Sequence, residues 1–289
     1  MKFKKRLPDL NAMVYKSLLY VPANRPRMQE KARVLPCDAV IFDLEDSVAI
    51  EEKTEARETL KDYLAQPFPK PFLIRVNAVD TEFFRDDLSL LEHCAPQAIV
   101  LPKANRDSLV TAGSGLDELG PDKRSIGILP LIENALDVKT VLGIMEASAR
   151  VIGAQLGAED LTADLEIRRT EAGGEISYAR HRVVYGARAM GCPAFDTPFV
   201  KLNNLQGLKQ DCREARRISF SGKTCIHPSQ LETVNRIFSP STVEIDSALR
   251  IIEAVKAHEG GVFSMEGRMI DEPVIERARQ ILRLADVDR

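Results

Sequence analysis

The sequence predicts an α/β protein: one (β/α)8 barrel followed by a C-terminal helical extension. Eight short runs, rich in β-branched residues, alternate with longer amphipathic stretches between residues 17 and 227, which is the pattern of repeated βα units. The runs are continuously apolar, as expected for parallel strands buried on both faces. A chain of 289 residues is also an ordinary length for one barrel. A doubly wound sheet is the alternative, weakened because no GxGxxG phosphate loop follows any predicted strand.

The elements follow from this alternation. The predicted strands are residues 17–22, 38–43, 72–77, 98–103, 125–133, 151–157, 193–198 and 222–227. The predicted barrel helices are residues 27–34, 50–64, 81–94, 105–116, 135–149, 176–190 and 202–217. Two further helices are expected at 229–238 and 243–257, then a Gly260-Gly261 turn and a last helix at 273–284.

The ends of the chain are predicted to lie outside the barrel. Residues 1–16 are basic but have no apolar core of a secretory signal, so we interpret them as a mobile or docking extension. The predicted barrel spans residues 17–228. Residues 229–289 follow its eighth strand, so this part is expected to pack outside the barrel or to reach a neighbouring subunit.

Composition excludes several functional classes. The net charge is -3, Trp is absent and aromatic residues make up 6% of the chain, which disfavours nucleic acid as a partner. No run approaches 18 apolar residues, so no membrane span is expected. The five cysteines are scattered, without a CxxC or zinc-type spacing. We expect buried thiols and a cytoplasmic protein.

Charged side chains gather at the predicted strand ends, where this fold collects its chemistry. Unpaired charge is costly to bury, so each residue must pair, bind a cation or face a ligand. For Asp43, Asp46 and His227, an ion pair or loop cap is an equally good interpretation. The full set is Asp43, Glu45 and Asp46 after the second strand, Arg75, Lys103, Glu133, Glu159 and Asp160, Asp196, and His227.

Glu133 and Asp160 form a candidate metal site. Two carboxylates without a His or Cys set indicate a hard cation, Mg2+ before Zn2+. Mg2+ keeps waters, which leaves coordination positions for a bidentate keto-acid, and it polarises the keto oxygen as a Lewis acid. The Arg75 guanidinium fits the keto-acid carboxylate. The small residues Gly157 and Ala158 allow the backbone to approach a ligand closely.

The chain resembles the citrate lyase β-subunit-like branch of the HpcH/HpaI aldolase superfamily, which includes malyl-CoA and citramalyl-CoA lyases. The resemblance covers nearly the whole chain from Ser17 onward, and its specificity comes from the order of its motifs. These motifs are SLLYVPANRPRMQEKA, DAVIFDLEDSVAIEEKTEAR, RVNAVDTEFFRDDL, VLPKA, LIENA, GAEDLTADL, CIHPSQ and GRMIDEP.

The resemblance implies roles at the barrel mouth and for a thioester. Arg75 and Glu133 would bind and activate the keto-acid, and Glu133 and Asp160 would hold Mg2+. The neighbouring Ala158 and Glu159 would contact the substrate. The aromatic, Arg and Lys of the opening motif, which contact coenzyme A in the family, fall on the residues Tyr20, Arg25 and Lys31.

The resemblance also assigns a role to the tail. Asp271, in the MID-x-P motif, would be the general acid/base and would come from an adjacent protomer, which implies a homo-oligomer, a trimer or hexamer. Relatives often have Asp-Gly before this motif, where this chain has Glu266-Gly267. Because the Gly is kept, we expect the turn to survive.

The expected function is Mg2+-dependent carbon–carbon bond chemistry on a 3-hydroxy-acyl thioester such as citryl-, citramalyl- or malyl-CoA, giving a keto-acid and an acyl thioester. Lys103 raises the possibility of a lysine aldolase, but a Mg2+ site makes a Schiff base unnecessary, so we interpret Lys103 as an ion-pair partner in the mouth. The alternatives are a class II aldolase on a free hydroxy-keto acid, the β-subunit of a citrate lyase complex using an acyl-carrier-protein thioester, and a non-catalytic scaffold.

Overall fold

The computed structural model describes residues 15–258 and 262–285, and within them eight parallel strands close into a barrel in chain order. The last strand pairs with the first, Ser17 lying opposite Lys223. The predicted (β/α)8 barrel is therefore confirmed. Its strands are β1 (Ser17–Pro22), β2 (Ala39–Asp43), β3 (Phe72–Arg75), β4 (Ala98–Leu101), β5 (Gly127–Ile132), β6 (Ala154–Leu156), β7 (Ala194–Asp196) and β8 (Gly222–Cys225).

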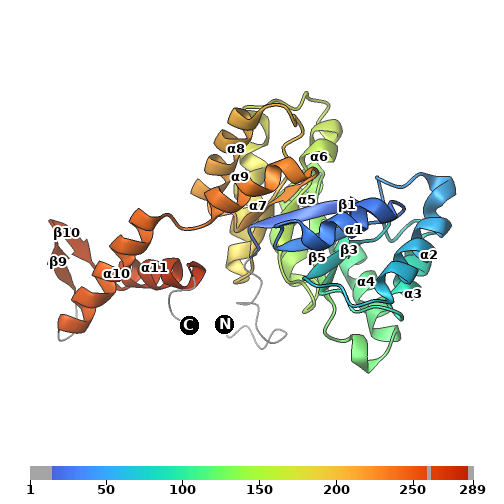
Figure 1. Cartoon of the computed structure of the whole chain (residues 1–289), viewed down its shortest axis with the longest axis horizontal. Coiled ribbons are helices and arrows are strands. Elements are labelled where there is room, and N and C mark those ends of the chain that lie inside the picture. The colour runs from blue at the N-terminus through green and yellow to red at the C-terminus, as the bar shows by residue number, and fades with distance from the viewer. Residues whose placement is uncertain (1–14, 259–261, 286–289) are drawn as a thin grey trace. The chain divides into compact units, whose positions relative to one another are not determined.

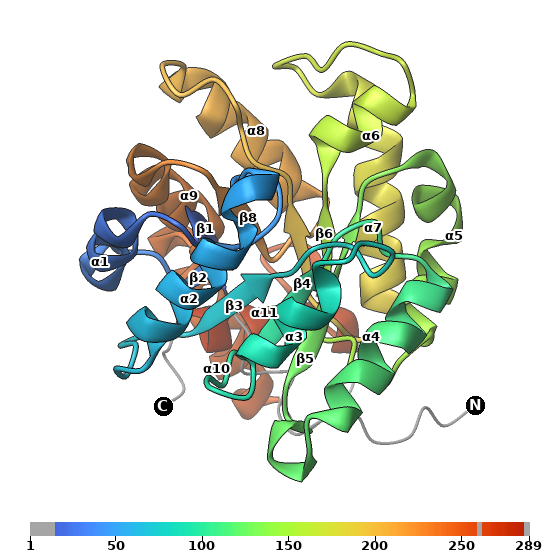
Figure 2. The ribbon, with the colours of Figure 1, turned by 90° about the vertical axis from the view of Figure 1, so that its right-hand side faces the viewer.

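Helices surround the strands (Figure 1, Figure 2). Asn105, Asn134 and Asn204 cap three of them by accepting backbone N–H groups of the first turn. The helices of this part are α1 (Pro26–Val34), α2 (Lys53–Leu64), α3 (Phe84–Leu90), α4 (Arg106–Glu118), α5 (Ala135–Glu146), α6 (Ala158–Asp164), α7 (Ser177–Ala189), α8 (Leu205–Arg217) and α9 (Leu231–Phe238).

Two helix predictions need correction. The helix predicted at 81–94 is only α3, because Thr81 instead closes a turn onto Ala78 through its hydroxyl and its N–H. The short α6, directly after β6, was not predicted. It has only seven residues, which is too short for a clear helical periodicity.

No helix in residues 15–258 and 262–285 has an apolar stretch long enough to cross a membrane. All five cysteines are buried free thiols, as predicted.

The barrel interior fixes which side chains reach its mouth. Leu18, Ile41, Leu73 and Leu131 belong to the buried cluster inside the barrel. Side chains two positions apart on a strand share a face. The next residues on that face, two positions further along, are Tyr20, Asp43, Arg75 and Glu133. The alternation therefore directs these polar side chains toward the carboxyl ends of β1, β2, β3 and β5.

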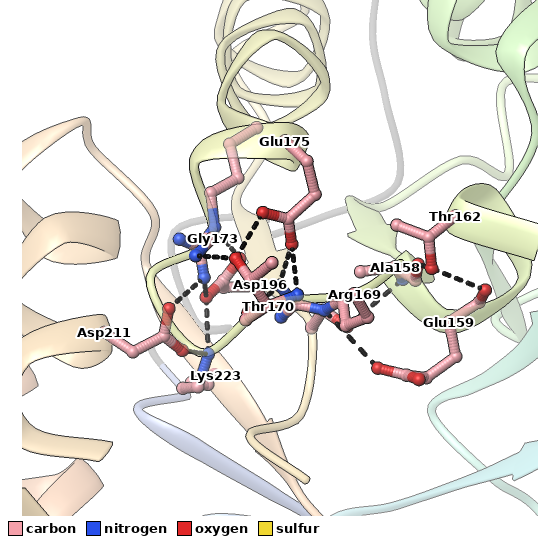
Figure 3. A network of polar contacts seen from close by, with 12 residues as sticks. Ala158, Glu159, Thr162, Arg169, Thr170, Gly173, Glu175, Asp196, Asp211 and Lys223 are labelled. Carbon is pink, nitrogen blue, oxygen red and sulfur yellow. Dashed lines mark hydrogen bonds and ion pairs between the residues drawn. The ribbon is translucent and has the colours of Figure 1, made fainter. Parts of the chain in front are cut away.

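The same rule corrects the prediction for Asp196. Phe195 is the interior residue of β7, so Asp196 faces outward, between the strands and the helices. It is fully buried there and accepts hydrogen bonds from Arg180 of α7 and Lys223 of β8. Figure 3 shows Asp196 with Lys223 and Asp211 of α8. Asp196 is therefore part of a buried ion network and not of the mouth.

Tyr15 and Lys16, at the end of the predicted N-terminal extension, contact the barrel. Tyr15 is 5% exposed and stacks on Phe195 inside the barrel. The Lys16 N–H donates to Asp38, and its carbonyl accepts from Lys223. A side chain at Gly222 would collide with the Tyr15 carbonyl. Tyr15 and Lys16 therefore close the amino-terminal end of the barrel, while residues 1–14 lie outside the described ranges.

The chain divides into two compact units, residues 1–235 and 236–289. The predicted boundary, after residue 228, lies before the helix α9, and it stays a prediction. Gln230, in the turn that follows β8, donates to the Phe199 carbonyl and accepts the N–H groups of Ile226 and His227. These bonds join the turn to the loops of the barrel. That residues 229–289 reach a neighbouring subunit remains a prediction.

The second unit is a pair of helices and a hairpin. Helices α10 (Thr242–Ala257) and α11 (Glu272–Leu284) pack through Ala248, Ala278 and Leu282, with isoleucines around them. The short antiparallel strands β9 (Phe263–Met265) and β10 (Arg268–Ile270) were not predicted. The predicted Gly260-Gly261 turn lies outside the described residues.

The turn between β9 and β10 is formed, as expected from the presence of Gly267. Glu266 and Gly267 both have left-handed backbones, with φ of 51° and 76°, as a tight two-residue hairpin turn requires. Glu266 also pairs with Arg250 at 2.9 Å. The turn delivers Asp271 to the start of α11, where its carboxylate accepts the Val274 N–H.

Candidate active site

Arg75 is the centre of an ionic cluster at the mouth. Its Nε and Nη2 donate to the two oxygens of Asp43, both at 2.7 Å. Its Nη1 lies 3.0 Å from Asp46 and 3.1 Å from Glu45. A guanidinium has five donors, so few remain for a substrate carboxylate. The interpretation of Asp43 and Asp46 as ion-pair partners is confirmed.

Tyr20 supports Arg75 from inside the barrel. The guanidinium carbon lies 5.0 Å from the centre of the Tyr20 ring, a cation–π distance. The Tyr20 hydroxyl accepts a hydrogen bond from Gln155 of β6 at 2.8 Å. Burial raises the pKa of this hydroxyl, so it stays protonated. Tyr20 therefore supports the Arg75 guanidinium through its ring.

Glu133 accepts a hydrogen bond from a residue with an unusual backbone conformation, Lys103. Its Oε1 accepts the Lys103 N–H at 2.5 Å, and Lys103 has a left-handed φ of 48°. Such a conformation costs a non-glycine residue about 1–3 kcal/mol and marks functional sites. A Cβ at Gly157 would lie 2.9 Å from Glu133 Oε2. Within the described part of the chain, Oε2 has no hydrogen-bond donor, so it is available to a ligand.

The turn after β6 carries the other predicted ligands. Asp160 is exposed, and its charge acts on Glu133. Ala158 is fully buried, and its N–H donates to Thr197 after β7 at 3.2 Å. Glu159 is exposed and pairs with Arg169 at 3.4 Å, as Figure 3 shows. Asp160 therefore lies at the mouth, whereas the Ala158 amide and Glu159 carboxylate have protein partners of their own.

Carboxylates outnumber the cations in this mouth. The carboxylates are Asp43, Glu45, Asp46, Glu133 and Asp160, and the cations are Arg75, Lys53 and Lys103. Desolvation, with the charges of Glu45 and Asp160, raises the pKa of Glu133 to about 8. Desolvation also raises the pKa of Glu45 to about 7. The mouth is thus short of positive charge.

These residues fit a magnesium ion. Among the residues that the structure describes, no three His, Cys, Asp or Glu side chains converge on one point. That excludes an all-protein cage but not Mg2+, which takes one or two carboxylates and completes its shell with water or substrate. Glu133, with a free Oε2, and Asp160 would supply those two carboxylates.

A cleft of about 310 Å3 opens beside this cluster, at the ends of β2, β3 and β4. Lys103 lines it, and among the described residues no carboxylate lies within ion-pair distance of its ammonium, so the predicted direct ion pair is not formed. The charge of Lys103 nevertheless acts to lower the pKa of Glu45. Lys53 is 5% exposed, and its ammonium donates to the carbonyls of Leu44 and Glu45. Lys53 thereby holds the loop that carries Glu45.

The predicted thioester contacts lie in two places. Arg25 and Lys31 are exposed at the start and along the length of α1. A hollow of about 480 Å3 is lined by Arg25, Pro26, Arg27 and Met28. Tyr20 instead points into the barrel under Arg75, so it does not share this surface. Arg27 was not predicted, although it adds to the same basic turn.

The last charged residue predicted at a strand end is His227, after β8, and it stabilises a turn. His227 caps the turn after β8, its Nδ1 accepting the Ser229 N–H. This confirms the loop-cap interpretation.

Sequence reasoning missed Gln155, Thr197 and Arg169. Gln155 is an uncharged strand residue, and Thr197 and Arg169 lie in loops without a recognisable motif.

Comparison with known proteins places the chain in a family. The model of the family described as HpcH/HpaI aldolase/citrate lyase matches residues 16–228. The citrate lyase subunit beta of Leuconostoc mesenteroides is 34% identical over 290 residues, covering 96% of this chain and 95% of that protein. A (3S)-malyl-CoA thioesterase of Cereibacter sphaeroides is 36% identical over 279 residues, covering 94% and 95%.

A solved structure agrees. The protein CitE from Mycobacterium tuberculosis, in complex with magnesium, acetoacetate and coenzyme A, is 31% identical and covers 94% of this chain and 98% of its own, with a TM-score of 0.79. Together with the eight-stranded barrel and the Arg75, Glu133 and Asp160 mouth, these matches show that the chain belongs to the HpcH/HpaI aldolase/citrate lyase family.

Proposed function

We propose that this chain is a Mg2+-dependent carbon–carbon lyase that cleaves, or forms by condensation, a 3-hydroxy-acyl thioester such as citryl-, citramalyl- or malyl-CoA. The observation that carries the proposal is the excess of carboxylates at the mouth, where Glu133 keeps a free oxygen beside Arg75 and Asp160. Relatives named citrate lyase subunit beta and (3S)-malyl-CoA thioesterase support it. So does the neighbour bound to magnesium and coenzyme A.

The chain's own residues account for binding and orientation. When bound, Mg2+ supplies Lewis-acid polarisation of the substrate oxygen. Arg75 would orient the carboxylate of the keto-acid half with its remaining N–H donors. In cleavage, the hydroxyl proton passes to a carboxylate of the mouth and the carbon–carbon bond breaks. Its electron pair moves onto the thioester as an enolate, which is protonated at carbon.

The thioester handle is proposed to lie over α1. Arg25 and Lys31 are exposed there and, with Arg27, suit the phosphates of coenzyme A. An acyl carrier protein presents its thioester on a phosphate-linked arm, so it is the second candidate handle, and the citrate lyase relatives favour testing it. The scaffold alternative is disfavoured because the Arg75, Glu133 and Asp160 set is intact. The buried free thiols are consistent with a cytoplasmic enzyme.

The test is a screen of citryl-, citramalyl- and malyl-CoA, and of the matching acyl-carrier-protein thioesters, by keto-acid release. We expect turnover with at least one of them in Mg2+. Excess chelator should remove that turnover, and added Mg2+ should restore it. Full turnover in chelator would refute the metal's role. Cleavage of free hydroxy-keto acids alone would favour the class II aldolase.

Asp271 is proposed as the acid that protonates the enolate, acting in the mouth of a neighbouring subunit of a trimer or hexamer. Asp271 follows β10 and caps α11, where its carboxylate accepts the Val274 N–H. Asp271→Asn and Glu133→Gln should each be inactive as pure proteins. Coexpressed, they should form mixed oligomers that regain activity, because some mouths combine an intact Glu133 with an intact Asp271.

The activity of the mixed oligomers tests whether Asp271 acts in the mouth of a neighbouring subunit. Activity should appear only in the fraction that carries both differently tagged subunits. An inactive mixed fraction, or wild-type turnover by pure Asp271→Asn, would contradict the intersubunit role. Gel filtration with light scattering would report the oligomer size.

A further inference from the structure

We propose that Asp164 is a positioning residue for the metal site: it fastens the end of α6 to the start of α5 and thereby keeps the Asp160 carboxylate facing Glu133. Asp164 itself would touch neither the metal nor the substrate. This inference rests on the proposed Mg2+ site at Glu133 and Asp160, and it adds a residue that controls how tightly the two bind the ion.

One hydrogen bond joins the helices that follow β5 and β6. The Asp164 Oδ2 accepts the Ala135 N–H at 2.8 Å, and Ala135 is the first residue of α5, two positions after Glu133. A carboxylate is favoured at a helix N-terminus, where N–H groups have no partner within the helix. Asp164 is therefore bonded directly to the segment that carries Glu133.

The start of α6 is fixed against the same segment. The Gly157 N–H donates to the carbonyl of Ile132, the residue before Glu133, at 2.9 Å. A Cβ at Gly157 would lie 2.8 Å from the Glu133 Cβ, so only a glycine lets the chain pass this close. Helix α6 thus begins beside Glu133 and ends at Asp164 beside Ala135.

Asp160 lies between these two attachments. It precedes Asp164 by four residues, so the two side chains lie on one face of α6, one turn apart. The face that meets α5 through Asp164 therefore turns Asp160 toward the end of β5, and the charge of Asp160 acts on Glu133. In residues 15–258 and 262–285 no hydrogen bond holds the Asp160 carboxylate, so the helix that carries it determines its position.

Helix α6 is short, but side-chain bonds add to its backbone hydrogen bonds. The Thr162 hydroxyl donates to the carbonyls of Ala158 and Glu159, at 2.9 and 3.0 Å. These bonds join the first turn of the helix, which carries Asp160, to the turn that carries Asp164. A displacement of Asp164 is therefore passed on to Asp160.

The two metal ligands need such a restraint. Metal binding requires both carboxylates in the ionised form, and in that form Glu133 and Asp160 repel each other until the cation is bound. Ligands that are already held in place lose less conformational freedom when they bind. The bond between Asp164 and Ala135 opposes the separation of the pair and should raise its affinity for Mg2+.

Mg2+ titration calorimetry on wild type, Asp164→Ala and Asp164→Asn tests this role. Loss of the acceptor in Asp164→Ala should weaken Mg2+ binding about tenfold, as for other groups that orient metal ligands. Asn is about as good a helix cap as Asp, so Asp164→Asn should bind Mg2+ within about threefold of wild type. Both variants lose the same negative charge, so their difference isolates the hydrogen bond. At saturating Mg2+, the kcat of Asp164→Ala should return to within about threefold of wild type, because both ligands remain.

Asp107→Ala is the matched control. Asp107 is an exposed acid in the first turn of α4, which also follows a barrel strand. Its loss should lower the urea midpoint of unfolding about as much as Asp164→Ala does, and it should leave the Mg2+ affinity unchanged. Circular dichroism checks that all the variants are folded.

Two results would overturn the proposal. Wild-type Mg2+ affinity in Asp164→Ala, whatever its unfolding midpoint, would mean that Asp164 only stabilises the fold. Equal losses of affinity in Asp164→Ala and Asp164→Asn would assign the effect to the lost charge and not to the bond with Ala135. If wild type cleaves none of the thioesters, the proposed function fails separately, and the calorimetry still decides the role of Asp164.

Discussion

Glu133→Gln is expected to weaken Mg2+ binding at least tenfold and to lower kcat/KM at least about 1,000-fold, since a bound metal supplies several kcal/mol of transition-state stabilisation. Gln keeps an oxygen that can accept the Lys103 N–H, which Glu133 accepts at 2.5 Å. The fold and the left-handed backbone of Lys103 should therefore survive. Mg2+ titration calorimetry and thioester cleavage kinetics measure the two effects, and circular dichroism checks the fold.

The same substitution should remove a proton linkage. Desolvation, with the charges of Glu45 and Asp160, raises the pKa of Glu133 to about 8 in the metal-free chain. At pH 7 the carboxyl is then largely protonated, so Mg2+ binding must release a proton, and Mg2+ affinity should rise as pH increases toward 8. Calorimetry in buffers of different ionisation enthalpy counts this proton in wild type and should find none in Glu133→Gln.

As the pH rises, the folding stability of the metal-free chain should fall, whereas its Mg2+ affinity should rise. The pKa of Glu133 lies above its ordinary value of 4.5, so the folded state binds this proton more tightly than the unfolded chain. Its contribution to stability is fully present below pH 4.5 and is lost as the pH rises through about 8. Saturating Mg2+ should oppose that loss. Wild-type Mg2+ affinity in Glu133→Gln, with no change in proton release, would remove Glu133 from the metal site.

Two of the predicted site residues lie at the barrel mouth for the same physical reason. Arg75 and Glu133 each follow an interior apolar residue by two positions, so strand periodicity alone directs them into the mouth. Asp196 was predicted at the mouth from its charge alone. The alternation of side chains along β7 was not considered, and in that strand Phe195 is the interior residue. That alternation would have assigned Asp196 to the helix side, where a buried carboxylate needs cationic partners.

Other features depend on contacts that no local pattern reveals. Lys103 has a left-handed backbone whose N–H donates to Glu133, thirty residues away. The support of Arg75 by Tyr20 requires β1 and β3 to meet inside a closed barrel. The β9–β10 hairpin has strands of three residues each, too short for alternation to stand out. Tyr15 was assigned to an extension because its burial partner, Phe195, is 180 positions along the chain.

Asp196→Asn is expected to destabilise the barrel unit by about 3–5 kcal/mol, because it leaves buried cations without their partner. Asp196 accepts from Arg180 at 2.9 and 3.0 Å and from Lys223 at 2.5 Å. Asp211 contacts the same two cations, at 2.5 and 2.6 Å. The pKa of Asp211 is held low, at about 2: its burial acts to raise it, but the cations Lys223 and Arg180 more than offset that effect. Two carboxylates thus balance two cations, and the substitution removes one negative charge without changing the shape.

Charge balance, and not loss of a contact alone, should govern the size of this effect. Adding Lys223→Met to Asp196→Asn leaves Asp211 with Arg180, one anion with one cation, and should recover part of the stability in urea unfolding. The exposed pair Glu214–Arg217 supplies the control, since Glu214→Gln should change stability by less than about 0.5 kcal/mol. If the double variant is less stable than Asp196→Asn, packing around the Lys223 stem outweighs the electrostatic term, and the buried network does not owe its stability to charge balance.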